Sequence, residues 1–316
     1  MAIHEHAEEN LHDHGVWTHG HVFLGHGHAR AEARARLATL ITAVFMAVEI
    51  ACGVAFGSMA LVADGVHMAT HVGALGLAAS AYWLARRHQG NARFTFGSGK
   101  FGDLAAFSSA IILGVVALAV AFESVERLLD PVVVRYASAL PIAALGLIVN
   151  LVSAFVLGGG HEHGHGHAAD HSHDLNLRAA FVHVLADAVT SVLAIAALAL
   201  GYFFGVAALD PIVGLIGAGV IASWSFGLVR DSGMVLLDAE DDPALSAEIR
   251  AMLERDMHAR VADLHLWRLG PGHRGLIVSL ICADDRTAED VKTALRRRYA
   301  ALSHVTVEIA VCADCT

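Results

Sequence analysis

The sequence predicts an α-helical membrane protein: six transmembrane helices followed by a C-terminal domain of the order αββαβ, of the ferredoxin-like type. Hydrophobic residues make up 56% of the 316 residues and charged residues only 16%, which is too apolar for an ordinary soluble domain. The apolar residues gather in six long runs, and a helix needs about 20 residues to cross a bilayer core. The chain becomes polar and strand-like only after residue 243. We therefore expect most of the chain to lie in a lipid bilayer.

Each apolar run is near or above the length needed to span a membrane. The alternative is a large soluble protein with buried helices, and it is disfavoured because so many long runs contain so few charges. The expected spans are Leu37–Phe56, Met59–Leu84, Leu104–Phe122, Ala137–Leu157, Ala179–Phe204 and Pro211–Val229.

Positive charges set the expected orientation, because cytoplasmic loops are enriched in Lys and Arg. Arginines precede the first span, and the loop after the second span contains three Arg and Lys100. We expect both termini and the loops after the second and fourth spans to face the cytoplasm. The expected domains are a tail over 1–36, a transmembrane domain over 37–229 with a His-rich loop over 158–174, and a cytoplasmic domain over 230–316.

Helix and strand patterns alternate in the C-terminal domain. The segment ALSAEIRAMLERDM has the spacing of an amphipathic helix. Two strands, VADLHLWRL and RGLIVSLIC, are separated by the turn sequence GPGHRG. TAEDVKTALRRRYAAL indicates a second helix and HVTVEIAV a last strand. This order predicts a small sheet with both helices on one face.

Two segments are rich in histidine: the N-terminal tail and the loop GGGHEHGHGHAADHSHD. Together they hold 14 of the 22 His. Glycine and polar residues between the His prevent packing, but leave the imidazoles able to capture metal weakly. The alternative is a solvated linker with no such role. The His expected to capture metal are His19, His21, His161, His163, His165, His167, His171 and His173.

Ionisable residues are rare in the expected spans, and each is costly in a membrane unless it has a partner or a function. They are Glu49, Asp64, His67, His71, His183 and Asp187. His67 and His71 are four residues apart, as are His183 and Asp187, so each pair lies on one helix face. Two such helices facing each other offer three imidazoles and one carboxylate, a tetrahedral set for a divalent first-row metal.

Other readings of these polar residues remain open. The two pairs could serve helix packing alone, but interhelical hydrogen bonds in membranes are worth only about 0.6–2 kcal/mol. Asp64 shares the face of His67 and His71, and it is either an outer ligand, a hydrogen-bond partner that orients His67, or a structural residue. Glu49 either pairs with a neighbouring helix or accepts a proton. Asn150 is expected to make a hydrogen bond between helices rather than to act as a metal ligand.

The motifs SMALVADGVHMATH, FTFGSGKFGDLAAF, HVLADAVTSVLAI, DPIVGLIGAGVI and VADLHLWRL resemble conserved blocks of the cation diffusion facilitator family. The resemblance covers nearly the whole chain. It implies a homodimeric antiporter that exports divalent metal in exchange for protons, needs no cofactor, and has a tail domain of metallochaperone-like fold. It also implies a transport site of His67, His71, His183 and Asp187, and a charge pair of Lys100 with Asp238 that helps to hold the subunits together.

Two departures from the family pattern bear on the choice of metal. The common zinc-type site has Asp where this chain has His71, and a third imidazole favours nitrogen-preferring metals over hard ions such as Mn²⁺. His71 and the segment WTHGHVFLG resemble the cobalt/nickel-efflux branch. The resemblance therefore favours Co²⁺, then Ni²⁺, then Zn²⁺, and a bacterial inner membrane; a zinc-selective exporter is the alternative.

The tail domain departs as well. Ala262 and Ser279 stand where some family members have zinc-binding His, so that site is not expected. His265, Cys312 and Cys315, with Asp314, form a different candidate regulatory site, although one CxxC motif is weak evidence.

Composition also weighs against other classes of protein. The net charge of −10 gives no sign of nucleic-acid binding, and the four Cys form no disulfide framework. An intramembrane metalloenzyme needs an open coordination position and a general base. Four protein ligands leave no open position. A membrane metal sensor is a more remote alternative, because sensing does not require six spans.

Overall fold

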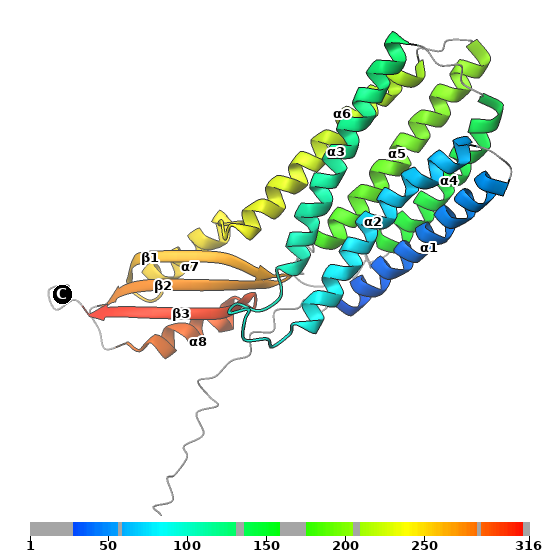
Figure 1. The fold of residues 1–316 in the computed structure, drawn as a ribbon. Coiled ribbons are helices and arrows are strands. Elements are labelled where there is room, and N and C mark those ends of the chain that lie inside the picture. The colour runs from blue at the N-terminus through cyan, green and yellow to red at the C-terminus, as the bar shows by residue number, and fades with distance from the viewer. Residues whose placement is uncertain are drawn as a thin grey trace, which may run out of the picture.

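The computed structural model describes residues 28–55, 59–130, 136–158, 175–204, 209–282 and 286–311, and contains a helical bundle with a small sheet domain at one end (Figure 1). The bundle helices are α1 (His28–Ala55), α2 (Met59–Arg87), α3 (Phe101–Leu129), α4 (Tyr136–Gly158), α5 (Leu175–Phe204) and α6 (Leu209–Leu236).

Four stretches of the described chain are helical, long and apolar enough to cross a membrane. They are His28–Cys52, Phe101–Leu129, Leu175–Leu193 and Pro211–Leu236. Large apolar side chains such as Leu118 and Phe122 on α3 are 70% and 74% exposed, which is the surface expected for contact with lipid. The chain is therefore a helical membrane protein.

Several helices extend beyond the expected spans. The helix α1 begins at His28 rather than Leu37, and α6 continues to Leu236, so the expected domain boundary at residue 229 falls inside a helix. The early start of α1 is stabilised by contacts with α2: Glu32 is 3% exposed and lies 3.1 Å from Arg86. Hydropathy marks only the part of a helix that lies in the bilayer, so it misses such polar extensions.

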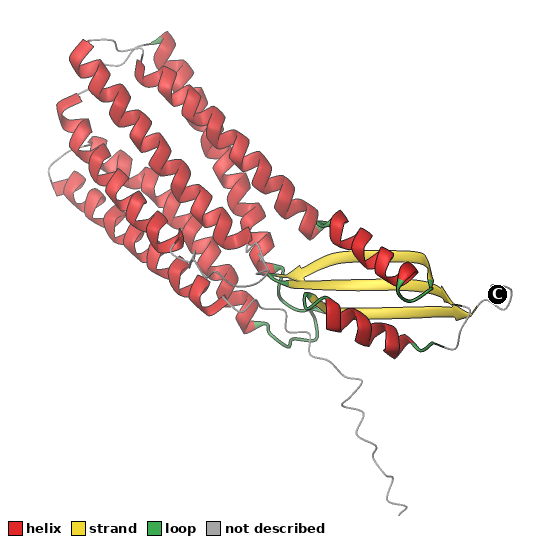
Figure 2. Cartoon of the chain, turned by 180° about the vertical axis from the view of Figure 1, so that it is seen from behind, coloured by secondary structure: helices red, strands yellow, loops and turns green. Residues whose placement is uncertain are grey.

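The C-terminal domain has the expected order of elements: α7 (Pro243–Arg255), β1 (Arg260–Gly270), β2 (His273–Cys282), α8 (Ala288–Arg298) and β3 (Leu302–Val311). The sheet order is β1-β2-β3, with β1 antiparallel and β3 parallel to β2. One cluster of buried side chains joins both helices to the sheet, and Figure 2 shows the helices beside the strands. The cluster includes Ile249 of α7, Val278 of β2 and Leu295 of α8.

The second helix of this domain is shorter than the sequence predicts. The expected helix extends to residue 302, but α8 ends at Arg298 and Leu302 is the first residue of β3. The helix begins with a capping box, in which Thr287 and Asp290 bind each other's backbone N–H groups. The hydrogen bond from Thr287 also holds the pKa of the Asp290 carboxyl below its ordinary value. The first residue of the helix is therefore well specified by the sequence. Its end is not, because the apolar residues after Arg298 continue the helical spacing although they lead into β3.

The sheet face opposite the helices contacts the loop between α2 and α3. Phe96 of this loop packs edge-on against Trp267 of β1 and His304 of β3, with ring centroids 5.6 Å and 5.5 Å apart. Trp267 lies over Gly275, its cross-strand partner on β2. The loop that follows α2 is thereby attached to the C-terminal domain.

We expect Gly275→Ala to loosen this attachment. A Cβ at Gly275 would lie 2.6 Å from Trp267 Cζ2, so the indole must move, at a cost of about 1–3 kcal/mol. Thermal unfolding of the full chain in detergent, followed by tryptophan fluorescence, should show a lower midpoint. The control is Gly227→Ala, because an added Cβ there meets nothing within 4 Å. Equal midpoints for the two variants would contradict the expectation.

Candidate metal-binding site

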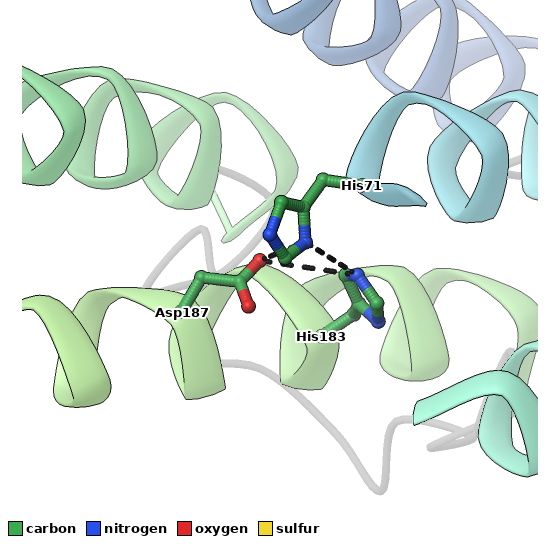
Figure 3. Close-up of side chains that lie close together, drawn as sticks. All are labelled: His71, His183 and Asp187. Atoms are coloured by element: carbon green, nitrogen blue, oxygen red, sulfur yellow. Dashed lines mark hydrogen bonds and ion pairs between the residues drawn. The ribbon is translucent and has the colours of Figure 1, made fainter. Parts of the chain in front are cut away.

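Three ionisable side chains meet inside the bundle: His71 from α2, and His183 and Asp187 from α5 (Figure 3). Their exposed fractions are 5%, 1% and 8%. His183 and Asp187 are one turn apart on α5, so the helix presents both to the same neighbour. Among the described residues, this is the one group of three or more His, Cys, Asp or Glu side chains close enough to hold a metal ion.

The distances between the ligand atoms suit a small divalent ion. His71 Nδ1 lies 2.9 Å from His183 Nε2 and 2.9 Å from Asp187 Oδ2, and the last two atoms are 3.8 Å apart. A tetrahedral ion with bonds near 2.0–2.1 Å separates its ligand atoms by about 3.4 Å. The observed distances bracket this value, so small side-chain movements would admit the ion.

The same geometry defines where a proton can sit. An imidazole nitrogen and a carboxylate oxygen both accept, so the close approach of His71 Nδ1 to His183 Nε2 and Asp187 Oδ2 is favourable when a proton lies between them. A metal ion needs the lone pair that this proton occupies. A cation bound by these atoms would therefore displace a proton held between them.

The remaining candidates in the membrane helices lie outside the described side chains. His67 and Asp64 belong to α2 and Glu49 to α1, and the positions of their side chains are not described. The structure thus brings together three of the four residues in the expected metal-binding set, and His67 precedes His71 by one helical turn.

Sequence reasoning missed Asn176, which braces the two helices of the site. Its side chain is 1% exposed, and its Nδ2 donates to the carbonyl of Ala78 on α2 at 2.9 Å. Asn176 precedes His183 by seven residues on α5, so both lie on one face. This seven-residue spacing is the sequence pattern that could have identified Asn176.

Lys100 and Asp238 form an ion pair within the chain. Asp238 lies just past the end of α6 with a φ of 56°, and the N–H groups of Asp238 and Ala239 donate to the carbonyls of Val235 and Met234. This is a Schellman motif with Asp in the position that glycine usually takes. The turn aims the Asp238 carboxylate at Lys100, the residue that precedes α3.

We expect Lys100→Ala and Asp238→Asn to have the same effect, because each removes the same ion pair. The side chains are 27% and 58% exposed, and exposed pairs contribute up to about 1 kcal/mol, so each variant should lower metal flux or subunit cross-linking by at most about fivefold. The double variant should be no worse than either single one. Asp238→Gly is the matched control. It also removes the carboxylate, but glycine adopts the positive φ at this position without strain. Multiplying effects in the double variant would contradict a shared role.

The other candidates are scattered or undescribed. His265 is on the exposed face of β1, where its Nε2 lies 2.8 Å from Asp263 Oδ2. Cys312, Asp314 and Cys315, and the His-rich stretches 1–27 and 159–174, lie outside the described residues. Only the last His of the expected tail is described: His28 begins α1, and its Nε2 lies 3.0 Å from the carbonyl oxygen of Tyr82.

The chain is similar to known cation efflux proteins. Residues 35–237 match the family model of the cation efflux transmembrane domain. The cadmium, cobalt and zinc/H(+)-K(+) antiporter of Bacillus subtilis is 29% identical over 294 residues, covering 90% of this chain and 92% of the relative. The zinc transporter ZitB of Escherichia coli is 34% identical over 232 residues, covering 73% and 71%. The metal cation efflux system protein CzcD of Cupriavidus metallidurans is 32% identical over 263 residues, covering 81% and 79%.

Proposed function

The chain belongs to the cation diffusion facilitator family of cation efflux transporters, and on that premise we propose that it exports divalent transition-metal cations from the cytoplasm in exchange for protons. The observation that carries the proposal is the buried group of His71, His183 and Asp187. His67 would complete a set of four ligands. The family consists of transporters rather than enzymes.

The close approach of the His71, His183 and Asp187 ligand atoms supports the exchange. Metal binds from the cytoplasm when His71 and His183 are neutral and Asp187 is ionised, and it displaces the proton that these groups hold. An imidazole suits this role because its ordinary pKa is near 6.5. When the site opens to a more acidic exterior, protonation of the His releases the metal. The B. subtilis relative is named for exchange with both H⁺ and K⁺, so K⁺ belongs among the counter-ions to be tested.

We propose Co²⁺ and Ni²⁺ as the preferred cargo, with Zn²⁺ next. Three imidazoles and one carboxylate favour borderline metals over Mn²⁺. A zinc-selective exporter is the second candidate, because two of the relatives described above are named for zinc.

The proposed setting is a homodimer in a bacterial inner membrane, with all six bundle helices crossing and both termini in the cytoplasm. Basic residues at the ends of α1 and α2 beside the C-terminal domain support this orientation. The exposed apolar surface of the bundle supports its burial in lipid.

The test is metal flux into proteoliposomes with an imposed pH gradient, comparing Co²⁺, Ni²⁺, Zn²⁺ and Mn²⁺, with K⁺ varied separately. Flux of Co²⁺ or Ni²⁺ above Zn²⁺ supports the proposed preference. Dominant Zn²⁺ flux keeps the exporter and overturns the preference. Absence of flux for every metal would favour a membrane metal sensor.

A further inference from the structure

Asn150 of α4 is a buried polar residue within the helical bundle. Its exposed fraction is 6%. The sequence predicts that its amide makes a hydrogen bond between helices. Ser153, one turn further along α4, lies 3.5 Å from Thr42 Oγ1 on α1. A buried amide needs a polar partner or a ligand, so the position of Asn150 relative to the metal-binding site matters.

The depth of Asn150 in the bundle follows from the packing nearer the C-terminal domain. Leu157 of α4, Ala78 of α2 and Ala180 of α5 belong to one buried cluster. The end of α4 packs against the beginning of α5, where a Cβ on Gly158 would meet Phe181 at 3.1 Å. The cluster therefore contains residues from the C-terminal halves of α2 and α4 and from the N-terminal part of α5.

On α2 and α5, a residue of the metal-binding site lies seven residues from a member of this cluster. Seven residues are close to two helical turns, or about 10 Å, and return to the same face. Seven residues away from the cluster, in the direction leading away from the C-terminal domain, are Asn150 on α4, His71 on α2 and Asp187 on α5. Asn150 and Asp187 therefore lie at a similar depth on the neighbouring helices α4 and α5, and His71 lies two turns from the same cluster.

We propose that Asn150 is a further member of the transport site and supplies a neutral oxygen to the cargo ion from a third helix. An amide oxygen suits a divalent cation, either as a ligand or as the acceptor for a metal-bound water. The amide oxygen carries no net charge, so it adds affinity for the ion. A second carboxylate in its place would attract the ion more strongly and slow its release. The proposal rests on the proposed function of the site in metal transport.

The test compares Asn150→Leu with Ser153→Ala, which alters the neighbouring polar position on the same face of α4. The measurements are the KM for Co²⁺ flux and the visible absorption of Co²⁺ bound to the full-length protein. Asn150→Leu should raise the KM about 10- to 100-fold, the usual effect of removing an outer partner of a metal site, and should change the Co²⁺ spectrum. Ser153→Ala should change the KM less than about threefold. Asn150→Ser is the second variant if the leucine variant does not fold.

The outcomes separate this proposal from the proposed function. If the unaltered protein transports Co²⁺ and the Asn150 variants leave both KM and spectrum unchanged, Asn150 is a packing residue and this inference is wrong. If the unaltered protein neither binds nor transports any of the four metals, the proposed function fails and this inference with it.

Discussion

Asp187→Asn should reduce metal flux at least about 100-fold, while leaving the protein folded. The change keeps the size and shape of the side chain but removes the one carboxylate in the described site. A divalent ion would then enter a buried site of neutral ligands, and loss of one partner from a buried charge pair costs about 3–5 kcal/mol. That cost corresponds to a factor of about 10² to about 4 × 10³ in binding.

The matched control is Asp231→Asn on α6. Asp231 also pairs with a basic side chain, Arg178 of α5 at 2.9 Å, but both side chains are nearly half exposed. Exposed pairs contribute at most about 1 kcal/mol, so this variant should keep most of its flux. Initial rates in proteoliposomes, with size-exclusion profiles to establish folding, measure both. If Asp187→Asn keeps flux similar to Asp231→Asn, the site on α2 and α5 is not the transport site.

Much of this site is predictable from helical spacing. The four-residue spacing of His183 and Asp187 places them on one face, and the cost of polar groups in a membrane indicates that such a face needs a partner. The structure supplies His71 as that partner. The choice of nitrogen is not predictable, because it depends on how α2 is rotated and how far it lies from α5. His71 uses Nδ1 and His183 uses Nε2.

Helix ends and contacts between domains are less accessible to sequence analysis. Hydropathy places the start of α1 at Leu37, but Glu32 is buried against Arg86, so the helix extends into a segment expected to be a tail. The contact of Phe96 with Trp267 joins residues far apart in the sequence, and neither residue has a local pattern that reports it. Such features depend on tertiary packing, which the period of the apolar residues does not encode.

The identity of the atom that His71 presents makes one substitution especially informative. In histidine Nδ1 is bonded directly to Cγ, as Oδ1 and Oδ2 are in aspartate. His71→Asp therefore replaces a nitrogen ligand with an oxygen ligand at nearly the same distance from the backbone. His183 presents Nε2, which is one bond further out, so His183→Asp would withdraw the ligand atom from the site.

His71→Asp should therefore keep transport and shift its preference toward Zn²⁺, whereas His183→Asp should lose transport. The first variant exchanges an imidazole for a second carboxylate, which weakens the preference for nitrogen-seeking Co²⁺ and Ni²⁺. We expect the ratio of Co²⁺ to Zn²⁺ flux to fall about tenfold, a change of about 1.4 kcal/mol. Competition between the two metals in the same proteoliposomes measures this ratio directly. An unchanged ratio in an active His71→Asp protein would show that selectivity arises elsewhere in the chain, and equal activity of the two variants would mean that the ligand atoms are not those that the structure brings together.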